Sequence, residues 1–118
     1  MQFNSKSNTG LMIGRYQPWH KGHRTLFEKI LAKEGQVCIC IRDTQGTSDK
    51  APLNVTTVIN NIHNDLKEDY HGKYTVYILP NITGVYYGRD VGYKVEQLKL
   101  DDEIESISAT KIRKEMGL

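Results

Sequence analysis

The stretch TGLMIGRYQPWHKGHRTLFEKILAKEG, residues 9–35, contains a strand-like run, a bend and a helix-like run in direct succession. Its first six residues are apolar or small and end in glycine, which favours a strand over residues 9–14. Apolar residues then recur at helical spacing, and Gly35 follows as a stop, so we expect a helix over about residues 22–33. The bend between the two elements is rich in histidine and in cationic side chains.

The alternation of strand-like and helix-like segments continues downstream. The run QVCICI, residues 36–41, is almost entirely apolar, which is typical of a strand covered on both faces. Asn54 can cap a second helix, because the apolar residues that follow it recur on one helical face. Those apolar residues are Val55, Val58, Ile59, Ile62 and Leu66.

Three more runs favour strands, and they are residues 73–79, 82–88 and 93–100. A last helix would begin after Ser108, which is a good N-cap, and end at Gly117. The order strand, helix, strand, helix, strands, helix predicts an α/β fold with a mainly parallel, five-stranded sheet flanked by helices. The length of 118 residues fits a single domain over residues 1–118.

Charge and hydropathy exclude several classes of protein. A net charge of +2 is too small for a chain that binds nucleic acid over a continuous basic face. No apolar run approaches the roughly 18 residues that a membrane-spanning helix needs, and the polar first residues do not resemble a signal peptide. We therefore expect a cytoplasmic protein without a nucleic-acid or membrane partner. Cys38 and Cys40 lack the CxxC spacing and are interpreted as buried free thiols in a reducing compartment.

The bend after the first strand has the features of a phosphate site. In parallel α/β sheets, ligands bind at the carboxyl ends of strands, where the next helix begins. Gly14 allows a tight turn there, and Gly22 allows a ligand to approach the helix N-terminus, whose free N–H groups favour phosphate. His20 and His23 add hydrogen-bond donors at the same point. Half of a zinc site and a pair of incidental surface histidines are the alternative interpretations of these two residues.

Two motifs resemble those of a known superfamily. HKGH, residues 20–23, is similar to the HxGH motif of nucleotidyltransferases (the cytidylyltransferase-like superfamily), and ISATKIR, residues 107–113, resembles their ISxTxxR signature. The lead-in GRYQPWH is similar to that of nicotinamide mononucleotide adenylyltransferases. RDTQGTSDK and YGRDVGYKVE look like segments of small phage-encoded nucleotidyltransferases, which would place the protein in the host cytoplasm.

The resemblance implies a Rossmann-like nucleotidyltransferase fold and a set of site residues. His20, His23 and Arg113 would act in catalysis by stabilising charge on the phosphates. Nucleotide binding is implied for the motif glycines and their neighbours, namely Gly14, Arg15, Tyr16, Gly22, Ser108 and Thr110. Capping remains an alternative main role for Ser108, and a solvated helix face remains one for Arg113.

The implied reaction transfers a nucleoside monophosphate, preferably AMP from ATP, to a small phosphorylated acceptor such as nicotinamide mononucleotide, with release of pyrophosphate. Mg²⁺ would be held mainly by the substrate phosphates, so we expect no metal site built from protein side chains. Acceptor binding is assigned to Trp19, Arg42, Lys50 and Arg89. Packing against the sheet is the alternative for Tyr16 and Trp19, and a surface turn is the alternative for Arg89.

Other functions remain open at this point. Transfer of CMP from CTP to a sugar phosphate or glycerol phosphate is one, although Gln17 stands where small cytidylyltransferases often carry aspartate. A module that binds a nucleotide without turning it over is another. A homo-oligomer is also expected to be possible for a chain of this size.

Overall fold

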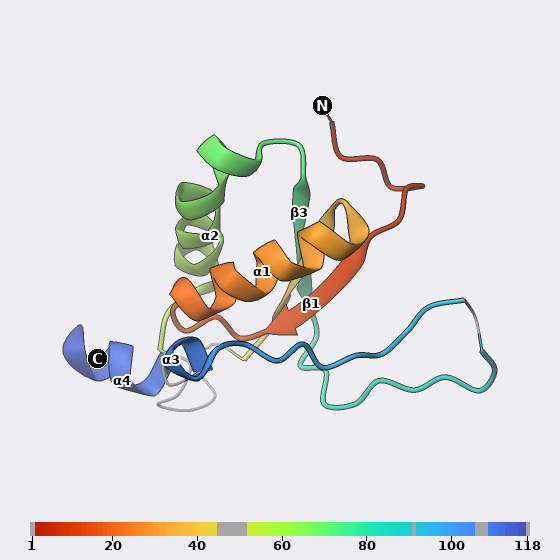
Figure 1. Ribbon diagram of the computed structural model, residues 1–118. Coiled ribbons are helices and arrows are strands. Elements are labelled where there is room, and N and C mark those ends of the chain that lie inside the picture. Colours follow the sequence, from red (N-terminus) through yellow and green to blue (C-terminus); the bar gives the residue numbers. More distant parts are fainter. Residues whose placement is uncertain (1, 45–51, 91, 106–108, 118) are drawn as a thin grey trace.

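The computed structural model describes residues 2–44, 52–90, 92–105 and 109–117, and at residues 102, 105 and 109–111 it describes the backbone alone. The elements in chain order are β1 Gly10–Gly14, α1 Lys21–Glu34, β2 Val37–Arg42, α2 Val55–Tyr70, β3 Tyr74–Leu79, α3 Asp102–Glu105 and α4 Ala109–Glu115 (Figure 1). No helix among these residues is long and apolar enough to cross a bilayer.

The three strands form a parallel sheet in the order β1-β2-β3. In its register Met12 lies opposite Ile39, and Ile39 lies opposite Val76. The α/β alternation and the parallel pairing expected for the first three strands are therefore confirmed. For these three strands and for α1, α2 and α4, the expected boundaries agree with the structure to within one or two residues, except at the carboxyl end of α2, for which the sequence had suggested no stop.

The expectation of a five-stranded, Rossmann-like nucleotidyltransferase fold is wrong, because the described residues form a sheet of only three strands. Residues 82–88 and 93–100 are described, and neither segment forms a strand. Most of their large apolar side chains are exposed, and although Leu98 packs against the core, neither segment has a continuous packed layer that favours extended pairing. An alternating apolar pattern predicts a strand only weakly when no such layer is present, and in these two segments the prediction was wrong.

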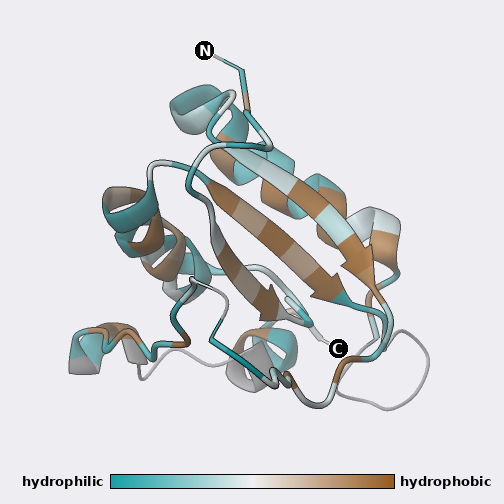
Figure 2. Ribbon diagram, turned by 90° about the vertical axis from the view of Figure 1, so that its right-hand side faces the viewer, coloured by the Kyte–Doolittle hydropathy of each residue, from teal (hydrophilic) through white to brown (hydrophobic). Residues whose placement is uncertain are grey.

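One face of the sheet packs against both long helices. Met12, Ile39 and Ile41 point to this face and share a core with Phe27 of α1 and Val58 of α2. Gly10 shows how closely α1 approaches, since a Cβ built on it would lie 2.1 Å from the Ile30 side chain. Figure 2 looks onto the sheet with these helices behind it. The core therefore lies in a single layer between the sheet and the two helices.

Sequence-encoded caps define both long helices. Asn54 accepts a hydrogen bond from the Thr57 N–H through its side-chain oxygen at 2.9 Å, which confirms its role as N-cap of α2. Gly35 ends α1 with φ of 92°, and its N–H donates to the Leu31 carbonyl at 2.8 Å. A left-handed glycine at this position releases the chain directly into β2.

The segment that follows β3 returns along α1 in the opposite direction. Glu96 pairs with Lys33 at 3.2 Å, and the Lys99 carbonyl accepts from the Lys29 ammonium group at 3.4 Å. At the N-terminal end of α1, the Ile104 carbonyl would lie 3.7 Å from a Cβ on Gly22. The return segment therefore carries α3 and α4 to the beginning of α1, as Figure 1 shows.

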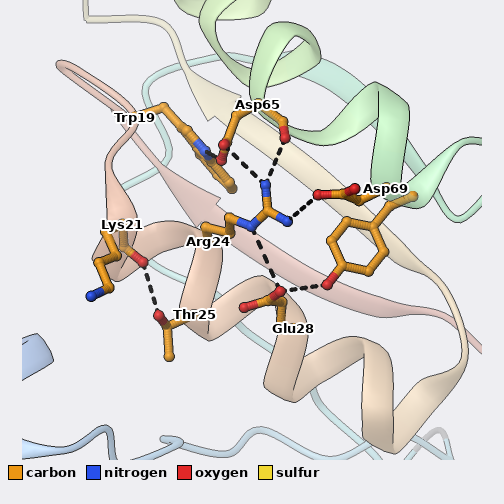
Figure 3. A network of polar contacts seen from close by, with 8 residues as sticks. Trp19, Lys21, Arg24, Thr25, Glu28, Asp65 and Asp69 are labelled. Carbon is orange, nitrogen blue, oxygen red and sulfur yellow. Dashed lines mark hydrogen bonds and ion pairs between the residues drawn. The ribbon is translucent and has the colours of Figure 1, made fainter.

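A cluster of charges holds α1 against α2 (Figure 3). Arg24 donates to the Asp65 carboxylate at 3.0 Å and to the Asp65 backbone carbonyl at 2.7 Å, and it reaches the Asp69 carboxylate at 2.6 Å. The Trp19 indole N–H donates to the other Asp65 oxygen at 2.8 Å. The guanidinium also lies 5.3 Å from the centre of the Tyr70 ring, whose hydroxyl donates to Glu28. Hydrogen bonds to Asp69 and Asp65 raise the pKa of Arg24, so it stays charged.

Replacing Arg24 with alanine is expected to lower the free energy of unfolding by about 1–3 kcal/mol, because several partly exposed ion pairs and one cation–π contact are lost together. Chemical denaturation of Arg24→Ala measures this change. Lys33→Ala is the matched control, because it removes a single, more exposed ion pair and is expected to cost less than about 1 kcal/mol. Equal losses in the two variants would contradict the importance of the cluster.

Candidate functional site

The site lies in the loop from Arg15 to His20, between the carboxyl end of β1 and the start of α1. This loop contains a cis peptide bond between Gln17 and Pro18, and Tyr16 adopts a positive φ of 52°. The loop leads directly into a 14-residue helix, and the two histidines of the HxGH-like motif lie at the first turn of this helix.

The two imidazoles cap this helix together. His20 is the N-cap, and its Nδ1 accepts from the Gly22 N–H at 3.0 Å. The Nδ1 of His23 accepts in turn from the His20 N–H at 3.1 Å, which completes a reciprocal capping box. The rings stack with centroids 3.8 Å apart and planes inclined by 27°. The motif is therefore a structural unit as well as a candidate site.

This arrangement assigns one tautomer to both rings. A nitrogen that accepts from a backbone N–H carries no proton, so each neutral ring has its proton on Nε2. Burial lowers the pKa of His20, and burial together with the neighbouring His20 lowers the pKa of His23 to about 3. Both histidines are therefore neutral near pH 7 and present two Nε2–H donors side by side.

Aromatic side chains build the wall behind His23. The Tyr16 ring meets it edge-on at 4.9 Å, and the Trp19 ring lies 5.5 Å away. Tyr16 is only 3% exposed and Trp19 only 8%, and the Trp19 indole N–H is engaged by Asp65. The structure therefore places both residues in the packing that supports the histidines. The Tyr16 hydroxyl is buried without a hydrogen-bond partner, and burial raises its pKa.

The two motif glycines make room for these rings. A Cβ on Gly14 would lie 2.8 Å from the Tyr16 ring, so only glycine lets that ring fold back over the end of β1. A Cβ on Gly22 would lie 2.8 Å from Cε1 of His20 and would displace the ring from its cap position. Neither glycine has a positive φ, so in this structure their role is the close approach of the rings.

Arg113 joins this loop from the other end of the chain. Its Nη1 donates to the Gln17 backbone carbonyl at 2.6 Å, and the residue is only 6% exposed. Gln17 is itself buried and ties the loop to the segment before α2. Its side-chain oxygen accepts from the Leu53 N–H at 2.7 Å, and its side-chain nitrogen donates to the Leu53 carbonyl at 2.9 Å. Three distant segments therefore meet at one residue.

Two other cations expected at the site lie at the same edge of the sheet. Arg15 directly follows β1 and forms no ion pair with any described residue. Arg42 ends β2, beside the register pair of Gly14 and Ile41, and donates to the Asn81 side chain at 2.9 Å. The Nε of Arg42 is buried without a partner. The carboxyl edge of the sheet is therefore lined by cationic side chains.

Of the remaining expected residues, Arg89 is not brought to the histidines. Arg89 lies exposed in the segment after β3, which projects away from the start of α1 (Figure 1). The same segment contains a hollow of about 310 Å³, lined by Tyr87, Asp90, Tyr93, Lys94 and Val95. Lys50 and Ser108 lie outside the described residues, and Thr110 is described by its backbone alone, in the first turn of α4.

The sequence analysis did not identify two residues that help to hold the site in place, Gln17 and Arg24. Gln17 was noted only as a departure from aspartate, and nothing in one sequence shows that its amide pairs with Leu53. Arg24 could have been found, because Arg24 and Glu28 are four residues apart on one helix, and so are Asp65 and Asp69 on the next. Such matched charge spacings indicate facing helix surfaces.

In the comparison with known proteins, no protein-family model and no curated protein matches the chain. The site must therefore be interpreted from its own geometry. Among the described residues, no group of three or more His, Cys, Asp or Glu side chains is arranged to hold a metal ion.

The free energy of unfolding is expected to decrease as the pH is lowered, because His23 resists protonation in the folded state. The folded-state pKa lies below the unfolded value of about 6.5, so the unfolded chain binds a proton that the folded chain excludes. The contribution is therefore complete above about pH 6.5 and is lost as the pH falls toward 3, at up to about 1.4 kcal/mol per pH unit.

Thermal melting of the wild type and of His23→Gln between pH 7.5 and 4.5 measures this contribution. Glutamine at this position can still accept from the His20 N–H, so the cap is retained. We expect the melting temperature of the variant to fall less steeply with acid than that of the wild type. Parallel curves for the two proteins would show that His23 is protonated in the folded state.

Proposed function

We propose that the chain is a nucleotidyltransferase that transfers a nucleoside monophosphate, preferably AMP from ATP, to a small phosphorylated acceptor and releases pyrophosphate. The observation that carries this proposal is the pair of neutral, stacked imidazoles at the N-terminus of α1, joined to Arg113 through Gln17. The similarity of the HKGH and ISATKIR motifs to those of nucleotidyltransferases supports the same assignment.

The two imidazoles suit the stabilisation of charge on a phosphate. Their Nδ1 atoms are engaged by backbone N–H groups, so neither ring can rotate without breaking the cap. The Nε2–H donors are therefore oriented before any ligand binds, which is the condition for effective stabilisation of a transition state. The first turn of α1 contains no acidic side chain, so the partial positive charge of the helix N-terminus is not offset there.

The proposed step needs no protein nucleophile or general base. An anionic oxygen of the acceptor phosphate attacks the α-phosphorus, a new P–O bond forms, and the bond from the α-phosphorus to the bridging oxygen breaks. Pyrophosphate leaves with that oxygen. The chain has to align the two reactants and stabilise the charge. In this proposal His20 and His23 contact the α-phosphate region, while Arg113, Ser108 and Thr110 act on the leaving phosphates.

Mg²⁺ would accompany the triphosphate. The donors at the site are imidazole N–H groups and guanidinium groups, which pair with phosphate oxygens and not with a cation, so they fit a metal ion held by the substrate. When bound, it would neutralise part of the phosphate charge. The protein's own contribution remains the orientation of the triphosphate by its histidines and arginines.

The carboxyl edge of the sheet is the proposed place for the acceptor. Arg15 and Arg42 follow neighbouring strands there, and both can pair with a phosphate. A mononucleotide such as nicotinamide mononucleotide, a sugar phosphate or glycerol phosphate shares this phosphate chemistry. CMP transfer from CTP, and nucleotide binding without turnover, are the alternatives that the experiments below separate from AMP transfer.

Removing the imidazole donors while keeping the cap is expected to abolish most turnover. His20→Asn retains a good N-cap acceptor, and His23→Gln retains the acceptor at the third helical position. Pyrophosphate release from ATP or CTP, measured with the phosphorylated acceptors named above, is expected to fall on the order of 10²–10³-fold in each variant. The melting temperatures are expected to change little.

Thr25→Ala is the matched control, because Thr25 lies on the same helix and its hydroxyl donates to the Lys21 carbonyl within that helix. It is expected to keep its rate. Turnover retained in both histidine variants would remove them from the reaction. Wild-type protein that binds a triphosphate but releases no pyrophosphate with any acceptor would identify the binding module instead.

A triphosphate that binds the folded state is expected to raise the melting temperature by mass action. Thermal melting with ATP, CTP, GTP and UTP at millimolar concentration and Mg²⁺ compares the four bases directly. We expect the largest shift with ATP. A larger shift with CTP would assign cytidylyl transfer, and no shift with any of the four would contradict a nucleotide site.

A further inference from the structure

The face of the sheet opposite the two helices is apolar and open. The strand register places two rows of side chains on this face, each running across β1, β2 and β3. One row is Leu11, Cys38 and Thr75, and the other is Ile13, Cys40 and Tyr77. None of them is charged. The outer strands carry the most exposed members, Leu11 at 57% and Tyr77 at 55%, while Ile13, Cys38 and Thr75 are half-buried and the central Cys40 is buried beneath its neighbours. Figure 2 faces this surface, which we call the open face.

An open apolar face is unusual for a parallel sheet. Parallel sheets occur almost only where both faces are covered, and soluble proteins rarely leave a contiguous apolar patch without a partner. The helices α1 and α2 both contribute to the core on the other face, and α3 lies at the start of α1. The described helices therefore leave this second face without a layer.

A second apolar surface extends from the same chain. Residues 82–90 and 92–95, which we call the tyrosine arm, project from the carboxyl ends of the strands on the side away from α2 (Figure 1). Their large apolar side chains are between 54% and 91% exposed, and they are Val85, Tyr86, Tyr87, Tyr93 and Val95. Tyrosine is enriched in protein interfaces because it offers a large apolar ring with a polar end.

We propose that a second copy of this chain covers the open face, with the tyrosine arm of each copy packed on the sheet of the other in a two-fold dimer. Both surfaces belong to one chain, so a two-fold axis satisfies both at once and leaves no further surface to recruit a third copy. The inference does not rest on the proposed function.

The available area fits a stable dimer. Three strands about 4.8 Å apart and five residues long give a face of about 240 Å². A complete tyrosine side chain offers about 200 Å² of surface. Multiplied by the exposed fractions of Tyr86, Tyr87 and Tyr93, this gives an exposed area on the order of 400 Å² for the arm. The sum is on the order of 600 Å² per copy, which reaches the lower range for specific interfaces.

The arm of the same copy is held away from the open face. At its beginning, Asn81 is bonded to Arg42, and just after its end Glu96 is paired with Lys33 on α1. Lys33 belongs to a helix that packs on the opposite face of the sheet, so the chain must leave the open face at this point. A second copy has no such restriction.

Sedimentation velocity of the wild type at about 1–100 μM is expected to show a species of twice the chain mass. Tyr77→Lys places a charge on the open face, Tyr86→Ser shortens the arm, and each is expected to weaken the dimer at least tenfold. Thr56→Lys is the matched control, because it adds the same charge to an exposed position on α2. Circular dichroism verifies the fold of each variant, and Leu11→Lys replaces Tyr77→Lys if that variant does not fold.

The thiols of the open face give an independent measurement. Burial and the hydrogen bond with Cys38 raise the pKa of Cys40 to about 12, so reaction with a disulfide reagent near pH 8 reports on Cys38. Dilution is expected to expose Cys38 and raise its rate of reaction several-fold. A monomer at 100 μM, a dimer that the charged open-face variant or Tyr86→Ser preserves at full strength, or a Cys38 rate independent of concentration would each overturn the proposal.

Discussion

Gln17 joins three segments of the chain that are far apart in the sequence. Its side chain pairs with both backbone groups of Leu53, and its carbonyl accepts from Arg113, while its own backbone belongs to the loop that carries the histidines. An amide buried at 2% exposure must satisfy its donors and its acceptor internally, so this pairing leaves it little freedom. The loop that carries the histidines is therefore held to two distant segments through this one residue.

The sequence predicted the elements whose signal is local and repeated. The apolar stripes of α1 and α2, the cap at Asn54 and the stop at Gly35 are set by residues close to one another, and they were confirmed. The two additional strands were wrong because strand patterns depend on a partner layer, which residues 82–88 and 93–100 do not have. For the site, the position of the histidines at a helix start was predictable, whereas their exchange of backbone N–H bonds was not.

The neutral state of both imidazoles separates two physical roles within the site. Because burial excludes a proton from His23, the rings act as hydrogen-bond donors and contribute no net charge. Electrostatic attraction of an anion must then come from the guanidinium groups and from the helix N-terminus. Hydrogen-bond direction and long-range attraction are thus supplied by different residues, so each can change without the other.

The contact between Gln17 and Arg113 spans 96 residues of sequence. The histidine bend and both of its long helices are synthesised well before the arginine that joins them. Closing so long a loop is entropically costly and comes late in folding. A chain emerging from the ribosome would therefore hold its imidazoles at the start of α1 before Arg113 has been made, and the guanidinium group would join the site in a later, separate step.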